Sequence, residues 1–280
     1  MTVTAELRDI PARDGYPLAA TVLGSGPDAV IINSATAVPR QYYGAYAEAL
    51  AAQGFTVVTY DYRGIGGSRR GRLRGFGAEA ADWALLDMAA VVDFAVDTFD
   101  PGALFLVAHS VGGQLAGLLD NASLVRGMVT VSSQSGYWRH QGRGQRLPVA
   151  VHTRLTLPFF ARTLGYVPWS RFSSAEDLPA GVALQWSRWC RDPRYLMGDP
   201  TLPLDRYAAF AAPVLAYSVD DDPWGTARSV DAMMSAYPSV ERRHLRARDH
   251  GLERIGHFGF FRRESRALWD ETFQWLGARR

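Results

Sequence analysis

The stretch from Leu104 to Leu119 constrains this chain more than any other, because it places three elements in a fixed order. An apolar run, Leu104 to Ala108, predicts a buried strand, and the residues from Gln114 to Leu119 favour a helix. Between them lies Ser110, two residues from Gly112. A serine on such a sharp strand-to-helix turn exposes its hydroxyl at the carboxyl edge of a sheet. Ser110 is therefore a candidate nucleophile, and an ordinary helix N-cap serine is the alternative.

The bulk properties of the chain are those of an ordinary globular protein. It has 280 residues, of which 48% are hydrophobic, and a formal net charge of +2. This length allows one large α/β domain with an inserted segment. The arginines are scattered apart from a short cluster between Arg69 and Arg74, and no basic stripe or recognisable nucleic-acid module accompanies them. We therefore expect no nucleic-acid partner.

Cysteine content and hydropathy exclude further classes of protein. The single cysteine, Cys190, cannot form an internal disulfide, and no Cys/His cluster has metal-ligand spacing. We expect neither a metal nor a cofactor. The polar N-terminus lacks the apolar segment of a signal peptide, and no apolar run is long enough to span a bilayer. These features predict a cytoplasmic protein without membrane insertion, and they leave a homodimer open.

Apolar runs alternate with amphipathic segments along most of the chain. Thr2 to Arg8 and Pro17 to Leu23 predict an antiparallel hairpin, and Phe261 to Ala278 predicts a terminal helix. Besides the strand before Ser110, buried strands are predicted at Ala29–Asn33, Phe55–Tyr60, Met128–Ser132, Val214–Tyr217 and Val240–Leu245. This alternation predicts an α/β fold, with a mostly parallel sheet covered by helices on both faces.

One long interruption separates the predicted strands at Met128–Ser132 and Val214–Tyr217. It spans roughly eighty residues without a convincing strand, far more than the usual connection. Helical periodicity in Val149–Leu164 and Ala180–Arg191 predicts a helical cap, residues 136–204, inserted above the carboxyl edge of the sheet. Residues 1–135 and 205–280 would form the core.

An acid and a histidine follow Ser110 in the order that a Ser-Asp-His arrangement after successive strands requires. Three consecutive aspartates follow the predicted strand Val214–Tyr217. The register favours Asp222 as the acid, with Asp221 as the alternate. His257 lies between glycines that would let its loop turn back toward the serine, whereas His250 is expected to be a polar loop residue. His109 neighbours Ser110, but its side chain is expected to point away and to pack.

Charge that develops on a substrate oxygen would need backbone N–H donors at two places. One is Val111, which follows the serine at a helix N-terminus. The other would come from the loop after Ala29–Asn33, where position favours Ala35 and the adjacent Thr36 adds a hydroxyl. Trp138, Trp186, Trp189 and Trp224 are candidate substrate contacts, with packing as the alternative for each.

Taken together, the motifs AVIINSATAVP, YDYRGIGGS, VAHSVGGQ, VDDDPWG and RIGHFGFF resemble the α/β-hydrolase superfamily over nearly the whole chain. Two positions depart from the family pattern: Asn33-Ser34 stands where many relatives have His-Gly, and Ala108 replaces the first glycine of the serine turn. The resemblance implies that Ser110 attacks an acyl carbon, His257 moves the proton and Asp222 orients the imidazole.

We therefore expect a serine hydrolase that cleaves an ester or related acyl bond of a small, hydrophobic substrate. An acyltransferase with the same three residues is one alternative. A ligand-binding protein on a hydrolase fold, without turnover, is the other.

Overall fold

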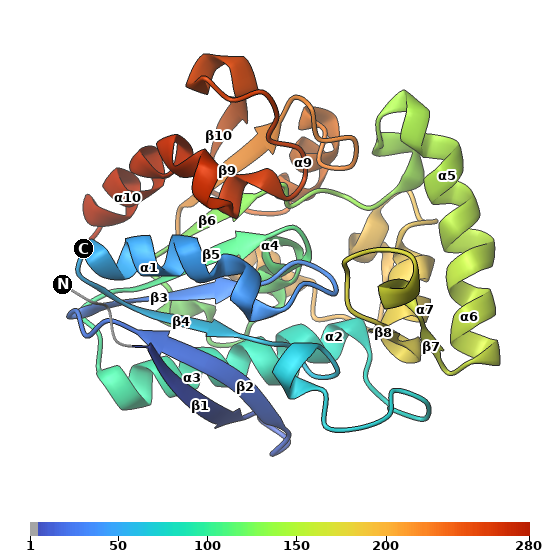
Figure 1. Cartoon of the computed structure of the whole chain (residues 1–280), viewed down its shortest axis with the longest axis horizontal. Coiled ribbons are helices and arrows are strands. Elements are labelled where there is room, and N and C mark those ends of the chain that lie inside the picture. Colours follow the sequence, from blue (N-terminus) through green and yellow to red (C-terminus); the bar gives the residue numbers. More distant parts are fainter. Residues whose placement is uncertain (1–4) are drawn as a thin grey trace.

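The computed structural model describes residues 5–280, and Figure 1 shows the arrangement of its elements. Eight strands form one sheet in the order β1-β2-β4-β3-β5-β6-β9-β10. These strands are β1 (Ala5–Pro11), β2 (Pro17–Leu23), β3 (Asp28–Asn33), β4 (Phe55–Tyr60), β5 (Leu104–His109), β6 (Gly127–Val131), β9 (Val214–Val219) and β10 (Val240–Leu245). From β4 to β10 all neighbours are parallel, whereas β2 pairs antiparallel with both β1 and β4. The predicted antiparallel start and mostly parallel sheet are confirmed, although residues 2–4 of the first predicted strand lie outside the described residues.

Helices cover both faces of this sheet because successive strand residues point to opposite sides. Val30 and Ile32 pack with α1 (Gly44–Ala52) and α10 (Trp269–Gly277), whereas Ile31 and Leu106 pack with helices of the other face. The helices on that other face include α2 (Ala80–Asp82), α3 (Ala89–Phe99), α4 (Val111–Leu115), α8 (Asp205–Ala209) and α9 (Ala227–Met234). A π-helical segment, Trp83–Met88, joins α2 to α3.

The predicted terminal helix begins later than the sequence indicates. α10 starts at Trp269, after a tighter 3₁₀ stretch, Arg263–Leu268, in which Ser265 leaves helical geometry. The indole Nε1–H of Trp269 donates to the carbonyl of Phe260 at 2.7 Å, so the chain folds back on itself instead of extending as one helix.

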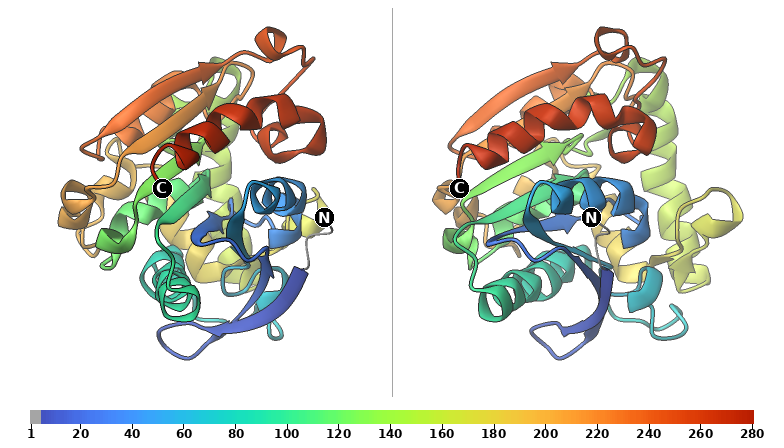
Figure 2. Two further views of the ribbon diagram at one scale, coloured as in Figure 1. Left: turned by 90° about the vertical axis from the view of Figure 1, so that its left-hand side faces the viewer. Right: turned by 60° about the vertical axis from the view of Figure 1, so that its left-hand side comes forward.

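The segment between β6 and β9 is mainly helical, and we call residues 136–204 the cap segment. It holds α5 (Arg146–Val151), α6 (Leu157–Thr163), α7 (Ala180–Trp189) and the short pair β7 (Tyr166–Val167) and β8 (Leu178–Pro179), which the sequence did not indicate. Gly142 N–H donates to Pro223 O at 3.1 Å, and Glu176 N–H donates to Ala37 O at 2.9 Å. Since these acceptors follow β9 and β3, the cap segment lies beside the carboxyl ends of the strands. Figures 1 and 2 both show this arrangement. Its separation into a domain of its own stays a prediction.

Within residues 5–280, no helix is both long and apolar enough to cross a membrane.

Candidate active site

Ser110 lies on a strained turn between β5 and α4. Its backbone angles are φ 51° and ψ −115°, in a region that residues other than glycine rarely adopt. A Cβ on Gly112 would come within 2.6 Å of the carbonyl oxygen of Asn33, so only glycine lets α4 pass this close to β3. A strained backbone persists only where the surrounding structure maintains it, and such residues are concentrated at functional sites.

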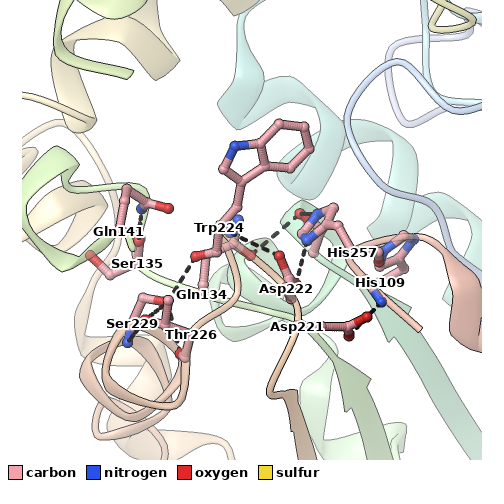
Figure 3. Close-up of polar contacts among 12 residues, drawn as sticks. His109, Gln134, Ser135, Gln141, Asp221, Asp222, Trp224, Thr226, Ser229 and His257 are labelled. Atoms are coloured by element: carbon pink, nitrogen blue, oxygen red, sulfur yellow. Dashed lines mark hydrogen bonds and ion pairs between the residues drawn. The ribbon is translucent and has the colours of Figure 1, made fainter. Parts of the chain in front are cut away.

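The structure brings His257 and Asp222 to Ser110. His257 Nε2 lies 3.1 Å from Ser110 Oγ, and His257 Nδ1 lies 2.7 Å from Asp222 Oδ2. Figure 3 shows the imidazole and the carboxylate facing each other. With Nδ1–H donating to the carboxylate, Nε2 is free to accept the serine proton. These distances are those of a nucleophile, a base and an orienting acid.

The two aspartates that the sequence left as alternatives have different contacts. Asp222 contacts His257, and its other oxygen accepts the N–H of Trp224 at 2.9 Å. Asp221 instead accepts the N–H groups of Ile255 and Gly256, at 3.0 and 2.7 Å. Asp221 thereby anchors the loop that carries His257, a contact visible in Figure 3.

Burial and hydrogen bonding act in opposite directions on the ionisation of Asp222. Asp222 is 2% exposed, Ser110 6% and His257 8%. Burial opposes ionisation of Asp222, but the adjacent His257 imidazole and further hydrogen bonds outweigh it and lower the pKa of Asp222 to about 2. The carboxylate is therefore charged at neutral pH and holds the imidazole by a charge-assisted bond. His250, in contrast, is an exposed residue of the turn Ala247–His250.

His109 belongs to a second buried network beneath the serine. Its Nε2 lies 2.8 Å from the carbonyl oxygen of His257, which can only accept, so Nε2 carries the proton. Its Nδ1 then accepts the hydroxyl of Tyr43 at 2.9 Å. Burial, together with the nearby His257, lowers the pKa of His109 to about 3 and keeps it neutral. The side chain is fully buried against Phe258 and Phe261, and it makes specific polar contacts as well as packing.

The contacts of Tyr43 in this second network show that one of the two predicted backbone N–H donors is wrong. The N–H of Ala35 donates to the Tyr43 hydroxyl at 2.8 Å, so it is already paired inside the protein and is not free for a substrate oxygen. The N–H of the next residue, Thr36, has no acceptor within residues 5–280. Val111 begins α4, where the first N–H groups lack partners in the helix, as predicted for the other donor position.

A third set of polar side chains joins Ser110 to the cap segment, and the sequence analysis missed it. Gln134 Oε1 lies 3.5 Å from both Ser110 Oγ and Gln114 Nε2. Gln114 Oε1 accepts the hydroxyl of Tyr195 at 2.8 Å, and Tyr195 in turn accepts the indole N–H of Trp186 at 3.0 Å. Only the position of Gln134, just after a parallel strand at the carboxyl edge, would have indicated it.

The four tryptophans predicted as substrate contacts have different surroundings. The ring of Trp224 lies 5.2 Å from that of His257, and Trp186 reaches the site through Tyr195. Trp189 is 2% exposed and donates to Asp199, and the ring of Trp138 lies against arginine side chains. Packing accounts for Trp189 and Trp138, whereas Trp224 and Trp186 lie on or near the site.

Comparison with known proteins gives one family match and many similar folds. The model of the alpha/beta hydrolase family matches residues 29–269. Est1E from Butyrivibrio proteoclasticus, bound to ferulic acid, is similar with 14% identity over 97% of this chain and 99% of its own, at a TM-score of 0.65. A thermophilic esterase from Thermogutta terrifontis, with malate bound, has 17% identity over 98% of each chain and a TM-score of 0.62. A hypothetical protein from Pseudomonas aeruginosa has 15% identity over 99% and 94%, with a TM-score of 0.68. At these identities the likeness shows the fold alone, and no curated protein matches the chain.

Proposed function

This chain belongs to the alpha/beta hydrolase family, and from that premise we propose that it is a serine hydrolase acting on a carboxylic ester. The observation that carries the proposal is the line of atoms from Ser110 Oγ through His257 to Asp222, with separations of 3.1 and 2.7 Å. The expected family resemblance and fold class are confirmed by the family match.

In the proposed reaction, Ser110 Oγ attacks the ester carbonyl while His257 Nε2 takes the hydroxyl proton. The tetrahedral intermediate collapses as His257 returns that proton to the leaving alcohol, which leaves an acyl group on Ser110. Water, activated by the same nitrogen, then releases the acid and restores the serine. Asp222 keeps the imidazole in the required tautomer and stabilises it when it is charged.

We propose that the oxyanion forms between the N–H of Val111 and the N–H of Thr36. Val111 offers a helix N-terminal donor, where the dipole favours negative charge. Thr36 replaces Ala35 in this role because the N–H of Ala35 is held by Tyr43. Losing one such donor typically costs about 10²–10³ in rate.

The proposed substrate is small and carries an apolar or aromatic acyl group. Trp224 lies beside His257, and the cap segment, residues 136–204, is proposed to form the rest of the wall through Trp186. Est1E, which has a similar fold, is bound to ferulic acid. A feruloyl ester therefore belongs in the substrate panel, beside nitrophenyl esters of increasing chain length.

Covalent labelling tests this function. A fluorophosphonate should label the native chain and should not label Ser110→Ala, and ester hydrolysis should disappear with the label. Labelling of Ser110→Ala at the native level would remove the serine from the mechanism. Absence of labelling in both proteins would favour the ligand-binding alternative.

Burial of the nucleophile supports acyl transfer as the second candidate. Ser110 and His257 are each less than a tenth exposed, and a site that excludes water prolongs the life of an acyl-enzyme until another acceptor arrives. Adding an alcohol or amine acceptor to the hydrolysis assay separates the two reactions. A transferase gives mainly the new ester or amide, and a hydrolase gives mainly the free acid.

A further inference from the structure

The outer edge of the cap segment is one long helix that carries large apolar side chains on both its inner and its outer face. α5, a π-helical turn (His152–Thr156) and α6 follow one another without a break from Arg146 to Thr163, a length of about 27 Å. Figure 1 shows this helix at the periphery of the molecule, far from the sheet. Its inner face buries Thr153, Leu157 and Ala161.

The outer face carries a stripe of exposed apolar side chains. Its members, at intervals of four residues along the helix, are Leu147, Val151, Leu155 and Phe159. They are between 43% and 72% exposed, and the nearby Phe172 is 73% exposed. Six of the nine large hydrophobic side chains that are exposed within residues 5–280 lie between Leu147 and Phe172. A continuous stripe of exposed apolar side chains is uncommon on a globular protein, and no other element within residues 5–280 covers this one.

The same region carries positive charge without any compensating acid. Between Gly136 and Ala175 the chain has no aspartate or glutamate but six arginines, Arg139, Arg143, Arg146, Arg154, Arg162 and Arg171. Among residues 5–280, no carboxylate lies within ion-pair distance of these six, whereas Arg69 and Arg70 of the earlier cluster pair with Asp177 and Asp9. The charge on this face is therefore available to an external partner.

Trp138, which precedes this helix along the chain, contacts two of these arginines. The guanidinium groups of Arg139 and Arg154 lie over its ring, 4.9 and 5.1 Å from the ring centre. Tryptophan, arginine and an exposed apolar helix face together are the composition of helices that lie in the headgroup region of a membrane.

We propose that this face of the cap segment docks on an anionic lipid surface, without crossing it. The stripe would enter the boundary between headgroups and acyl chains, and the arginines would contact the lipid phosphates. A second copy of this chain fits less well, because a symmetric contact would place like-charged arginines against one another. An acidic protein would satisfy the arginines, but the projecting ridge of a single helix offers it no groove.

Vesicle co-sedimentation tests the proposal on the full chain with Ser110→Ala, so that no turnover occurs. We expect binding to vesicles of phosphatidylcholine mixed with phosphatidylglycerol, and binding that is about tenfold or more weaker to phosphatidylcholine alone or at high salt. Leu155→Ser combined with Phe159→Ser should abolish binding. Leu7→Ser, which removes an apolar side chain that is 74% exposed on β1, should leave it unchanged.

Three results would overturn the proposal: no binding to anionic vesicles, equal binding to neutral ones, or equal loss with Leu7→Ser. A dimer in solution that Leu155→Ser and Phe159→Ser dissociate would assign the stripe to a second copy instead. Arg154→Glu combined with Arg162→Glu tests the contribution of positive charge to vesicle binding independently. Both side chains are exposed, and the apolar stripe stays intact in this variant. These outcomes do not depend on the proposed hydrolysis, since binding is measured with Ser110 removed.

Discussion

Polar and apolar side chains are distributed in opposite ways in two regions of the molecule. One region is the edge of the sheet around Ser110, and the other is the outer face of the helix from Arg146 to Thr163. Around Ser110 the acid, the imidazole and the hydroxyl are buried and bonded to one another. On the outer helix, apolar side chains are exposed and the arginines have no carboxylate partners within residues 5–280. The proposed chemistry therefore depends on contacts made inside the protein, whereas the exposed groups of the outer helix are those that we propose contact an anionic lipid surface.

The largest effect should come from the histidine that contacts the serine. His257→Ala removes the proposed base, and loss of such a group in a serine hydrolase costs on the order of 10⁶ in kcat. His250→Ala is the matched control, since His250 lies on an exposed turn only seven positions away. Hydrolysis of a nitrophenyl ester measures both. A large loss with His250→Ala would contradict the geometry of the site.

The two aspartates provide a sharper contrast within one turn. Asp222→Asn leaves His257 without its charged partner and should lower kcat by about 10⁴. Asp221→Asn keeps that partner and weakens the bonds to Ile255 and Gly256, so it should lower kcat far less while reducing the melting temperature. Activity and thermal unfolding of both variants are the measurements. Equal loss of kcat would mean that the His257 loop depends on Asp221 for its geometry.

Sequence patterns predict much of the candidate site because Ser110 and the aspartates follow buried strands and His257 lies in the loop after the last strand. The apolar runs that predict β5 and β9 also fix where Ser110 and the aspartates emerge, and the glycines around His257 mark a loop that can turn back. What periodicity cannot resolve is the choice between Asp221 and Asp222. Neighbouring residues of a turn point their side chains in different directions. Only the conformation of the folded loop decides which of the two carboxylates contacts the imidazole.

The missed and mistaken residues depend on contacts between distant parts of the chain. The Tyr43 hydroxyl accepts the N–H of Ala35 from the 3₁₀ turn Arg40–Tyr43, and no local pattern around Ala35 signals a hydroxyl there. Gln114 meets Tyr195 across 81 positions of sequence, through the cap segment. Composition does not indicate which tryptophan ring faces the site, so the sequence could not separate Trp224, whose ring lies 5.2 Å from that of His257, from the buried Trp189. Short-range patterns therefore place the elements, and tertiary packing decides the neighbours.

The two faces of the cap helix differ in the stability that they supply. Leu157 is fully buried, and Leu157→Ala should lower the free energy of unfolding by about 2–5 kcal/mol through lost burial and the cavity left behind. Leu155, two positions away, is 65% exposed, so Leu155→Ala should change it by no more than about 0.5 kcal/mol. Urea unfolding followed by circular dichroism compares them. A large cost for Leu155→Ala would show that its face is already covered in the isolated protein.

The smallest effect concerns the buried network beneath the serine, and its sign follows from His109. Because the pKa of His109 is lowered from 6.5 to about 3 on folding, only the unfolded chain binds a proton there as the pH falls below 6.5. The stability contributed by this residue is complete above that pH and declines by about 1.4 kcal/mol per pH unit below it, or about 2 kcal/mol between pH 6.5 and 5. Asp222 does not contribute in this interval, since its pKa moves from 3.8 down to about 2. Burial also lowers the pKa values of His140 and His152, and these residues destabilise the native chain and the His109→Gln variant equally in acid. The difference between the two proteins therefore reports on His109 alone. Urea unfolding across this pH range should give His109→Gln the shallower dependence, and identical slopes would show that His109 is not held neutral by its burial.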